Sequence, residues 1–151
     1  MIFSTTTEYA IRGMAELAVR AGDGHEVRSV MLDDLVVGTT LPRDFLAKVF
    51  QRLVKAGLLN SAKGRGGGFT LARNAGAIKL IDIVTAIDGP ELLDRCAVGL
   101  ERCNDAQPCP QHESYKPVRQ RIRQYLTDTT LAELANSLLI KRSYTKTKIK
   151  R

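Results

Sequence analysis

The chain has 151 residues, 44% of them hydrophobic, and a formal charge of +7, which suits one compact domain with an appended element. Charges at Glu8, Arg12 and Glu16 argue against a signal peptide, and no apolar run approaches the ~20 residues of a membrane span. We therefore expect a cytoplasmic protein with no membrane partner. Its three cysteines would then stay reduced and serve metal or redox chemistry rather than a disulfide framework.

The positive charge is concentrated in two segments. Six of the 23 basic residues lie in the last eleven, so we expect residues 141–151 to form a basic, flexible tail rather than a DNA-binding arm. Between Arg43 and Arg73, seven basic residues accompany a single acid, Asp44. This second segment is the candidate for contact with nucleic acid.

The first third of the chain predicts three helices. Thr5 and Glu8 have the spacing of a capping box, and helical periodicity follows to about residue 21. A short amphipathic helix is expected over residues 30–37, and a third helix from about Pro42 to Ala56, since proline suits a first helical turn. Two helices joined by a short turn indicate a helix-turn-helix.

A glycine-rich segment, SAKGRGGG, follows the third helix between two short apolar runs. Its glycines allow the positive backbone angles of a hairpin, which would form a wing with Lys63 and Arg65 at its tip. A P-loop is disfavoured because the G-K-[ST] ending is missing and a strand follows instead of a helix. Arg43 and Lys48 lie on the outward face of the third helix, as DNA contacts or as an ordinary solvated face.

The runs FLAKVFQRLVKAGLLNSAKGRGGGFTLAR and IKLIDIVTAIDG resemble the iron-sulfur winged-helix transcriptional regulators, the family of the IscR-like and NsrR-like proteins. The resemblance spans most of residues 1–139. It implies a mostly α fold with a small β-wing: a winged helix-turn-helix over residues 1–75, then a cluster-binding loop and dimerisation helices over residues 76–140.

The resemblance also implies that the third helix enters the major groove of double-stranded DNA and that Lys63 probes the minor groove. The expected DNA contacts are Thr40, Pro42, Arg43, Lys48, Lys63 and Arg65. The helix begins Leu41-Pro42-Arg43-Asp44, which departs from the small polar residues common in the family, so no operator sequence is implied.

Two more helices are expected near the end of the chain. The first starts near Tyr115, and a second capping box, from Thr130 to Glu133, begins a separate short helix. A narrow apolar face on the first of them consists of Val118, Ile122, Tyr125 and Leu126. By resemblance this is the long dimerisation helix of a homodimer, and folding back onto its own domain is the alternative.

All three cysteines lie in one proline-containing loop. With the histidine that follows they form the pattern C-x6-C-x5-C-x2-H, made by Cys96, Cys103, Cys109 and His112. The spacing is too wide for a zinc knuckle, and the polar surroundings do not suit apolar fillers. It is close to the C-x5-C-x5-C of the family, with one extra residue between the first two cysteines. The resemblance therefore implies an iron-sulfur cluster, with [2Fe-2S] favoured and [4Fe-4S] open.

Two residues compete for the fourth ligand position. His112 is one, because a neutral imidazole can replace a thiolate. Glu8 is the other, because in NsrR-like members an acid at this place in the first helix reaches the cluster from the partner subunit. A capping box by itself also explains a carboxylate at Glu8.

The sequence thus predicts a homodimeric transcriptional regulator, a repressor at a palindromic operator, whose DNA affinity depends on a cluster that senses redox state, nitric oxide or iron status. Nothing resembles a substrate-binding constellation, so an enzyme is not expected. Two alternatives stay open. One is an electron carrier or redox enzyme that uses the wing for protein contacts, and the other is a winged-helix regulator with a structural zinc or a thiol switch in the same loop.

Overall fold

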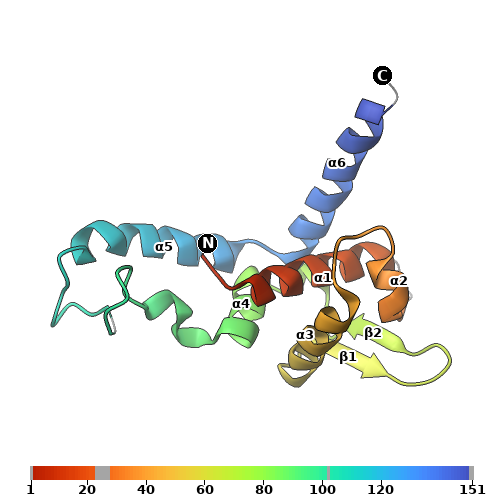
Figure 1. Cartoon of the computed structure of the whole chain (residues 1–151), viewed down its shortest axis with the longest axis horizontal. Helices are drawn as coiled ribbons and strands as arrows, with labels where there is room; N and C mark the ends of the chain where they lie inside the picture. Colours follow the sequence, from red (N-terminus) through yellow and green to blue (C-terminus); the bar gives the residue numbers. More distant parts are fainter. Residues whose placement is uncertain (1, 23–27, 102, 150–151) are drawn as a thin grey trace.

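The computed structural model describes residues 2–22, 28–101 and 103–149. In chain order the elements are α1 (Thr5–Ala21), α2 (Leu32–Val36), α3 (Arg43–Lys55), β1 (Leu59–Ala62), β2 (Gly68–Leu71), η1 (Ala75–Ala77), α4 (Leu80–Asp88), η2 (Pro90–Asp94), α5 (His112–Asp128) and α6 (Leu131–Ile149). They form a helical body with one antiparallel hairpin, from which α5 and α6 extend in different directions (Figure 1). The predicted fold class, mostly α with a small β-wing, is confirmed.

Helix α1 lies in the middle of the body and is capped by Ser4. The Ser4 hydroxyl oxygen accepts the N–H of Thr7 at 3.2 Å, while Asp88 at the end of α4 accepts the backbone N–H of Ser4 at 2.8 Å and its hydroxyl at 2.5 Å. The predicted capping box of Thr5 and Glu8 is therefore wrong, because Ser4 does the capping. Among the described residues, none forms a hydrogen bond with the side chain of Glu8.

A glycine in α1 lets α3 approach it closely. A Cβ at Gly13 would lie 2.7 Å from Cδ1 of Leu46 and 2.8 Å from Cε1 of Phe50. Both of these α3 side chains are fully buried, as is Met14 of α1. Because this packing leaves no spare volume, the position of α3 is set by its contact with α1.

The chain before α2 is extended rather than helical. Val30 donates its N–H to the carbonyl of Phe69 at 3.0 Å and accepts the Phe69 N–H at 2.9 Å, which adds an isolated bridge to the outer edge of β2. Gly68 permits this approach, since its φ is +116° and a Cβ there would lie 2.4 Å from the Val30 oxygen. The helix predicted over residues 30–37 is consequently shorter, Leu32–Val36.

The predicted wing hairpin is confirmed. Strands β1 and β2 pair antiparallel, from Leu59 opposite Leu71 to Ala62 opposite Gly68. Phe69 packs edge-on against Phe50 with ring centroids 5.0 Å apart, which fastens the hairpin to α3. The exposed turn between the strands contains Lys63 and Arg65.

A backbone bridge fastens the junction of α5 and α6 to the body. The N–H of Leu80 at the start of α4 donates to the carbonyl of Thr129 at 3.0 Å. Thr130 then caps α6: its N–H donates to Glu133 Oε2 at 2.6 Å, and the N–H of Glu133 donates to Thr130 Oγ1 at 3.2 Å. The second predicted capping box is confirmed.

Two expectations for the C-terminal half need correction. Leu126 is fully buried in the chain's own core, where α5 contacts α4, so it is not on a face open to a partner. Helix α6 continues to Ile149 and packs on α1 and η1, so residues 141–149 extend a helix instead of forming a flexible tail. Residues 150 and 151 of the expected tail lie outside the described residues.

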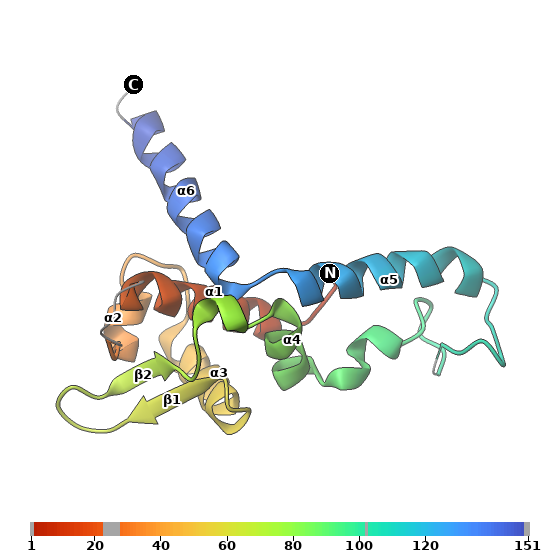
Figure 2. The same cartoon turned by 180° about the vertical axis from the view of Figure 1, so that it is seen from behind.

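The far end of α6 and the wing hairpin lie on opposite sides of the body in both views (Figures 1 and 2). The basic end of α6 is therefore remote from the surface formed by α3 and the wing of the same chain. Within the described ranges, no helix combines the length and apolar character needed to cross a bilayer.

Candidate nucleic-acid interface and cysteine loop

Helix α3 and the wing present exposed cations on one side of the body. Lys48 of α3 and Lys63 and Arg65 of the wing are exposed, and none of them forms an ion pair with another described residue. Arg52 is exposed too, but its Nη2 donates to the carbonyl of Ile87 at 2.5 Å, which ties α3 to α4. Lys48, Lys63 and Arg65 are therefore available to phosphate groups.

Arg43 behaves differently from the other predicted DNA contacts. Its guanidinium donates to a carboxylate oxygen of Asp33 in α2 and, at 3.1 Å, to Asp44. The hydrogen bond with Asp33 raises the pKa of Arg43 and lowers the pKa of Asp33 from their ordinary values. Arg43 thus links α2 to α3, and contact with DNA would require it to leave two carboxylates.

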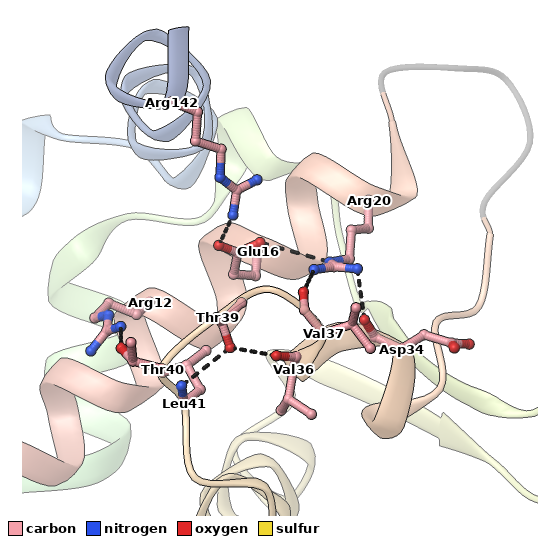
Figure 3. A network of polar contacts seen from close by, with 10 residues as sticks. All are labelled: Arg12, Glu16, Arg20, Asp34, Val36, Val37, Thr39, Thr40, Leu41 and Arg142. Atoms are coloured by element: carbon pink, nitrogen blue, oxygen red, sulfur yellow. Dashed lines mark hydrogen bonds and ion pairs between the residues drawn. The ribbon is translucent and has the colours of Figure 1, made fainter. Parts of the chain in front are cut away.

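The turn between α2 and α3 is held from two sides (Figure 3). Thr39 Oγ1 donates to the carbonyl of Val36 at 2.8 Å, and Arg12 of α1 donates through Nη2 to Thr40 Oγ1 at 2.7 Å. Pro42 is the exposed N-cap residue of α3. Thr40 and Pro42 therefore lie at the entrance of α3, as predicted, with the Thr40 oxygen already engaged by Arg12.

The cysteine loop lies at the outer end of α5, between η2 and the first turn of that helix (Figure 1). Asp94 anchors it: its carbonyl accepts the N–H of Cys103 at 3.2 Å, and its carboxylate accepts from Arg123 of α5 at 2.9 Å. The base of the loop, its middle and α5 are thereby held together.

The four predicted ligands of the loop come together as two pairs. Cys96 Sγ lies 3.7 Å from Cys109 Sγ, and Cys103 Sγ lies 3.0 Å from His112 Nδ1. All three cysteines are free thiols. In the part of the chain that is described, no three His, Cys, Asp or Glu side chains are arranged to hold a metal ion, so the two pairs do not form one four-ligand geometry.

Backbone amides surround the sulfur of Cys96. The hydrogen bond from the N–H of Val98, followed by those of Leu100 and Gly99, lowers the pKa of the Cys96 thiol below its ordinary value. Lowering the pKa favours the thiolate, which is the form of cysteine that binds metals. The loop therefore favours the form of Cys96 that a metal would require.

His112 is 1% exposed and has a partner at each ring nitrogen. Its Nε2 lies 2.8 Å from Asp105 Oδ1, and Lys116 Nζ lies 2.6 Å from the same oxygen. The hydrogen bond from Lys116, followed by that from His112, lowers the pKa of Asp105. A carboxylate at Nε2 favours the tautomer with the proton on that nitrogen, and in this tautomer the lone pair of Nδ1 faces Cys103.

Asp105 and Lys116 are not among the site residues predicted from the sequence. His112 and Lys116 are four residues apart on α5, and this spacing was the available signal that both would face the same part of the loop. A hollow of about 1140 Å³ also opens beside Cys103. It is lined by Glu91, Asp94, Arg95, Leu100, Glu101, Cys103, Asn104 and Gln107.

The other predicted positions lie outside this loop. Glu8 is half-buried on α1, and no hydrogen bond among the described residues connects it to the loop ligands. On α5, Val118 is 49% exposed, Tyr125 is 52% exposed, and Ile122 is half-buried. Three of the four predicted dimerisation residues are therefore accessible, whereas Leu126 is not.

Comparisons with known proteins agree with this arrangement. The chain is 33% identical over 137 residues to the HTH-type transcriptional regulator IscR of Yersinia enterocolitica, covering 91% of this chain and 80% of the relative. It is 31% identical to a putative HTH-type transcriptional regulator of Aquifex aeolicus, covering 90% and 92%.

Among solved structures, CymR, the global cysteine regulator of B. subtilis, aligns with a TM-score of 0.72 at 28% identity, covering 89% of this chain and 96% of that one. The T. potens IscR aligns with a TM-score of 0.67 at 27% identity, covering 89% and 86%. The model of the Rrf2 family, described as an iron-dependent transcriptional regulator, matches residues 3–137. With its helix-turn-helix, wing and long C-terminal helices, the chain belongs to the Rrf2 family of DNA-binding transcriptional regulators.

Proposed function

We propose that this regulator works in the cytoplasm as a homodimeric repressor at a palindromic operator, and that an iron-sulfur cluster modulates its DNA affinity. The ligands would be Cys96, Cys103, Cys109 and His112. The main support for the cluster is the geometry of the buried His112. Its Nδ1 faces Cys103, and its Nε2 lies beside the carboxylate of Asp105. We propose no enzymatic activity.

The surface of α3 and the wing supports binding to duplex DNA. A major groove admits one α-helix, and α3 has an exposed outer face that includes Lys48. The wing tip, with Lys63 and Arg65, would then reach the backbone or the neighbouring minor groove. The unpaired state of these three cations supports a direct phosphate contact, whereas the paired Arg43 contributes to the position of α3.

The accessible face of α5 supports a homodimer. Val118 and Tyr125 are large and exposed on the helix that begins in the cysteine loop, with the half-buried Ile122 between them. Pairing α5 with its copy across a two-fold axis would cover these side chains. Since α5 begins at His112, directly after the loop that holds the three cysteines, and also carries the pairing face, a change at the loop would alter the separation of the two α3 helices, on which half-site recognition depends.

The chemistry of the loop fits an iron-sulfur cluster. The bound cluster would supply a centre that is sensitive to oxidation, nitric oxide and iron supply. Within the chain, the amides around Cys96 stabilise a thiolate, and Asp105 orients the imidazole of His112. Three thiolates and one imidazole favour a [2Fe-2S] over a [4Fe-4S] cluster. The relatives named IscR support the same class of cofactor.

Glu8 of the partner subunit is the alternative fourth ligand. Because Ser4 caps α1, the carboxylate of Glu8 has no capping function that would occupy it. In the alternative arrangement His112 would remain a buried partner of Cys103 rather than a ligand.

A thiol switch is the second candidate function, favoured by one specific distance. The Sγ atoms of Cys96 and Cys109 lie 3.7 Å apart, so a small movement would allow a disulfide. A peroxide would take two electrons and the two thiol protons, forming water as the disulfide forms. One of the solved structures in the comparison is an oxidised form of CymR from Staphylococcus aureus.

Metal and sulfide analysis of protein purified without oxygen tests the proposal. We expect about two iron and two sulfide per chain, with visible absorption typical of a mixed-ligand cluster. Stoichiometric zinc without iron would indicate a structural zinc site instead. Metal-free protein in which peroxide joins Cys96 to Cys109, as seen by mass spectrometry, would indicate the thiol switch.

A further inference from the structure

A carboxylate is buried in α1 at a place that neither the DNA surface nor the cysteine loop uses. Glu16 is 5% exposed and lies between two guanidinium groups (Figure 3). Arg142 of α6 donates through Nη2 to Glu16 Oε1, and Arg20 Nε lies 3.7 Å from Glu16 Oε2. A buried carboxylate that loses its cationic partner is strongly destabilising, so both arginines matter to this site.

Arg20 directs the rest of its guanidinium toward α2. Its Nη1 donates to the carbonyl of Asp34 at 2.6 Å, and its Nη2 donates to the carbonyl of Val37 at 2.6 Å. Arg20 thereby adds a donor to the carbonyl of Asp34, which also accepts the N–H of Val37 at 3.3 Å, and supplies a donor to the carbonyl of Val37, the C-cap residue of α2. Val37 directly precedes the turn that leads into α3. Arg20 therefore fixes the beginning of the turn that positions α3.

The hydrogen bonds of Glu16 are distributed unequally between the two arginines. Glu16 Oε2 and Arg20 Nε are both buried and have no hydrogen-bond partner among the described residues. Both Nη groups of Arg20 are thus hydrogen-bonded to carbonyls at the end of α2, while the direct hydrogen bond to Glu16 comes from Arg142. Without Arg142, Arg20 would be the remaining donor to Glu16 among the described residues, and closing the 3.7 Å between Arg20 Nε and Glu16 Oε2 would pull the guanidinium away from its two acceptors on α2.

We propose that Glu16 is a positioning residue for DNA recognition, acting on the turn before α3 through Arg20. Arg142 determines whether Arg20 keeps its hydrogen bonds to the carbonyls at the end of α2. The inference rests on the proposed binding of DNA by α3. Arg142 lies beyond residue 137, where the match to the family model ends. Helix α6 also follows α5 after two residues, so a displacement of α5 reaches Arg142 through one continuous helix.

The first test is Arg142→Met, which keeps an apolar stem and removes both charge and donors. The matched control is Lys141→Met, which removes the same charge from the neighbouring exposed position of α6. The probe is a labelled duplex selected by the wild-type protein from a randomised pool. We expect Arg142→Met to weaken binding by about tenfold and Lys141→Met to leave it unchanged. The salt dependence of Arg142→Met should match wild type, because no phosphate contact is lost.

The second test is rescue by Glu16→Gln in the Arg142→Met background. A neutral amide no longer draws Arg20 away from α2, so the double variant should regain most of the lost DNA affinity. Thermal unfolding of all variants verifies that they are folded. A double variant that binds DNA as weakly as Arg142→Met, although it is folded, would refute competition for Arg20 as the cause.

A third readout needs no DNA. Backbone amides of residues 35–41 should exchange hydrogen faster in Arg142→Met, and Glu16→Gln should reverse the change. Wild-type exchange rates together with wild-type affinity in Arg142→Met would overturn the inference. So would an equal loss of binding in Lys141→Met, or a reduced salt slope, since these indicate a charge effect or a phosphate contact. If the wild-type protein selects no duplex, the proposed DNA-binding function is wrong. The hydrogen-exchange rates of residues 35–41 then decide by themselves whether Arg142 stabilises the turn before α3.

Discussion

Asp105 Oδ1 lies 2.8 Å from Nε2 of the buried His112, and Cys103 Sγ lies 3.0 Å from Nδ1 of the same ring. The carboxylate and the thiol therefore face the two different nitrogens of one imidazole. Carboxylates commonly hold the second nitrogen of a metal-bound histidine in this way, because the hydrogen bond fixes both tautomer and ring orientation. The two nitrogens of His112 therefore have different partners, as they would in a metal-bound histidine.

The first prediction concerns Asp105. Replacing it with Leu removes the acceptor for Nε2, so iron should be released to a chelator about 10 to 100 times more readily than from wild type. Asp105→Asn is the matched control, since its amide oxygen still accepts a hydrogen bond and should restore much of the retention. Loss of visible absorption after chelator addition measures the effect. A Leu variant that retains its cluster as wild type does would show that Asp105 does not orient a ligand.

The second prediction concerns the ligands themselves. Changing Cys96, Cys103 or Cys109 to Ala should remove most of the cluster absorption, while circular dichroism stays unchanged because the apolar core lies outside the loop. A variant of any of the three that keeps a full spectrum would exclude that cysteine as a ligand.

The fourth ligand is decided by two variants that give opposite outcomes. If His112 is a ligand, His112→Ala should shift or abolish the spectrum and Glu8→Gln should leave it unchanged. If Glu8 of the partner subunit is the ligand, the results reverse, and cluster loss should also loosen the dimer. Glu8→Gln is a clean probe because Ser4, and not Glu8, caps α1.

The third prediction concerns the wing. Lys63→Ala and Arg65→Ala should each weaken duplex binding and reduce the salt slope by about one, because each would lose a phosphate contact. Arg43→Ala should change the slope less, since Asp33 and Asp44 already neutralise Arg43. Anisotropy titrations at several salt concentrations measure these slopes. Wild-type binding by both wing variants at every concentration would contradict the winged mode.

The fourth prediction concerns assembly. Val118→Asp or Ile122→Asp should give folded monomers, because a charge in an apolar seam is costly. Leu126→Ala should instead lower the free energy of unfolding by about 2 to 5 kcal/mol, since Leu126 belongs to the core of its own chain. Light scattering and chemical denaturation distinguish the two effects. Folded α5 variants that remain dimeric would place the interface elsewhere.

Local sequence patterns were sufficient for the helix-turn-helix, the wing and the cap of α6. Apolar periodicity locates α1 and α3, the glycines of residues 64–68 allow the hairpin, and Thr130 and Glu133 are only three residues apart. These features depend on neighbours in the chain, and the sequence displays such neighbours directly.

Features that depend on distant contacts were not predictable in the same way. Ser4 replaces Thr5 as the cap because Asp88 holds it from 84 residues away. Helix α6 has no apolar stripe in its basic half, and its contact with α1 through Arg142 and Glu16 spans 126 residues. The narrow apolar stripe on α5 did not allow the prediction that Leu126 is buried while Tyr125 is exposed. Each outcome is decided by tertiary packing rather than by local spacing.

The most direct test of the account compares DNA affinity with and without the cluster. Protein purified without oxygen is titrated into the selected duplex before and after its iron is removed by nitric oxide or a chelator. Cys109→Ala serves as a permanently cluster-free reference. We predict that the intact protein binds at least about tenfold more tightly, and that the treated protein and Cys109→Ala bind equally weakly. Equal affinity of the loaded and cluster-free forms for the same duplex would contradict the central claim.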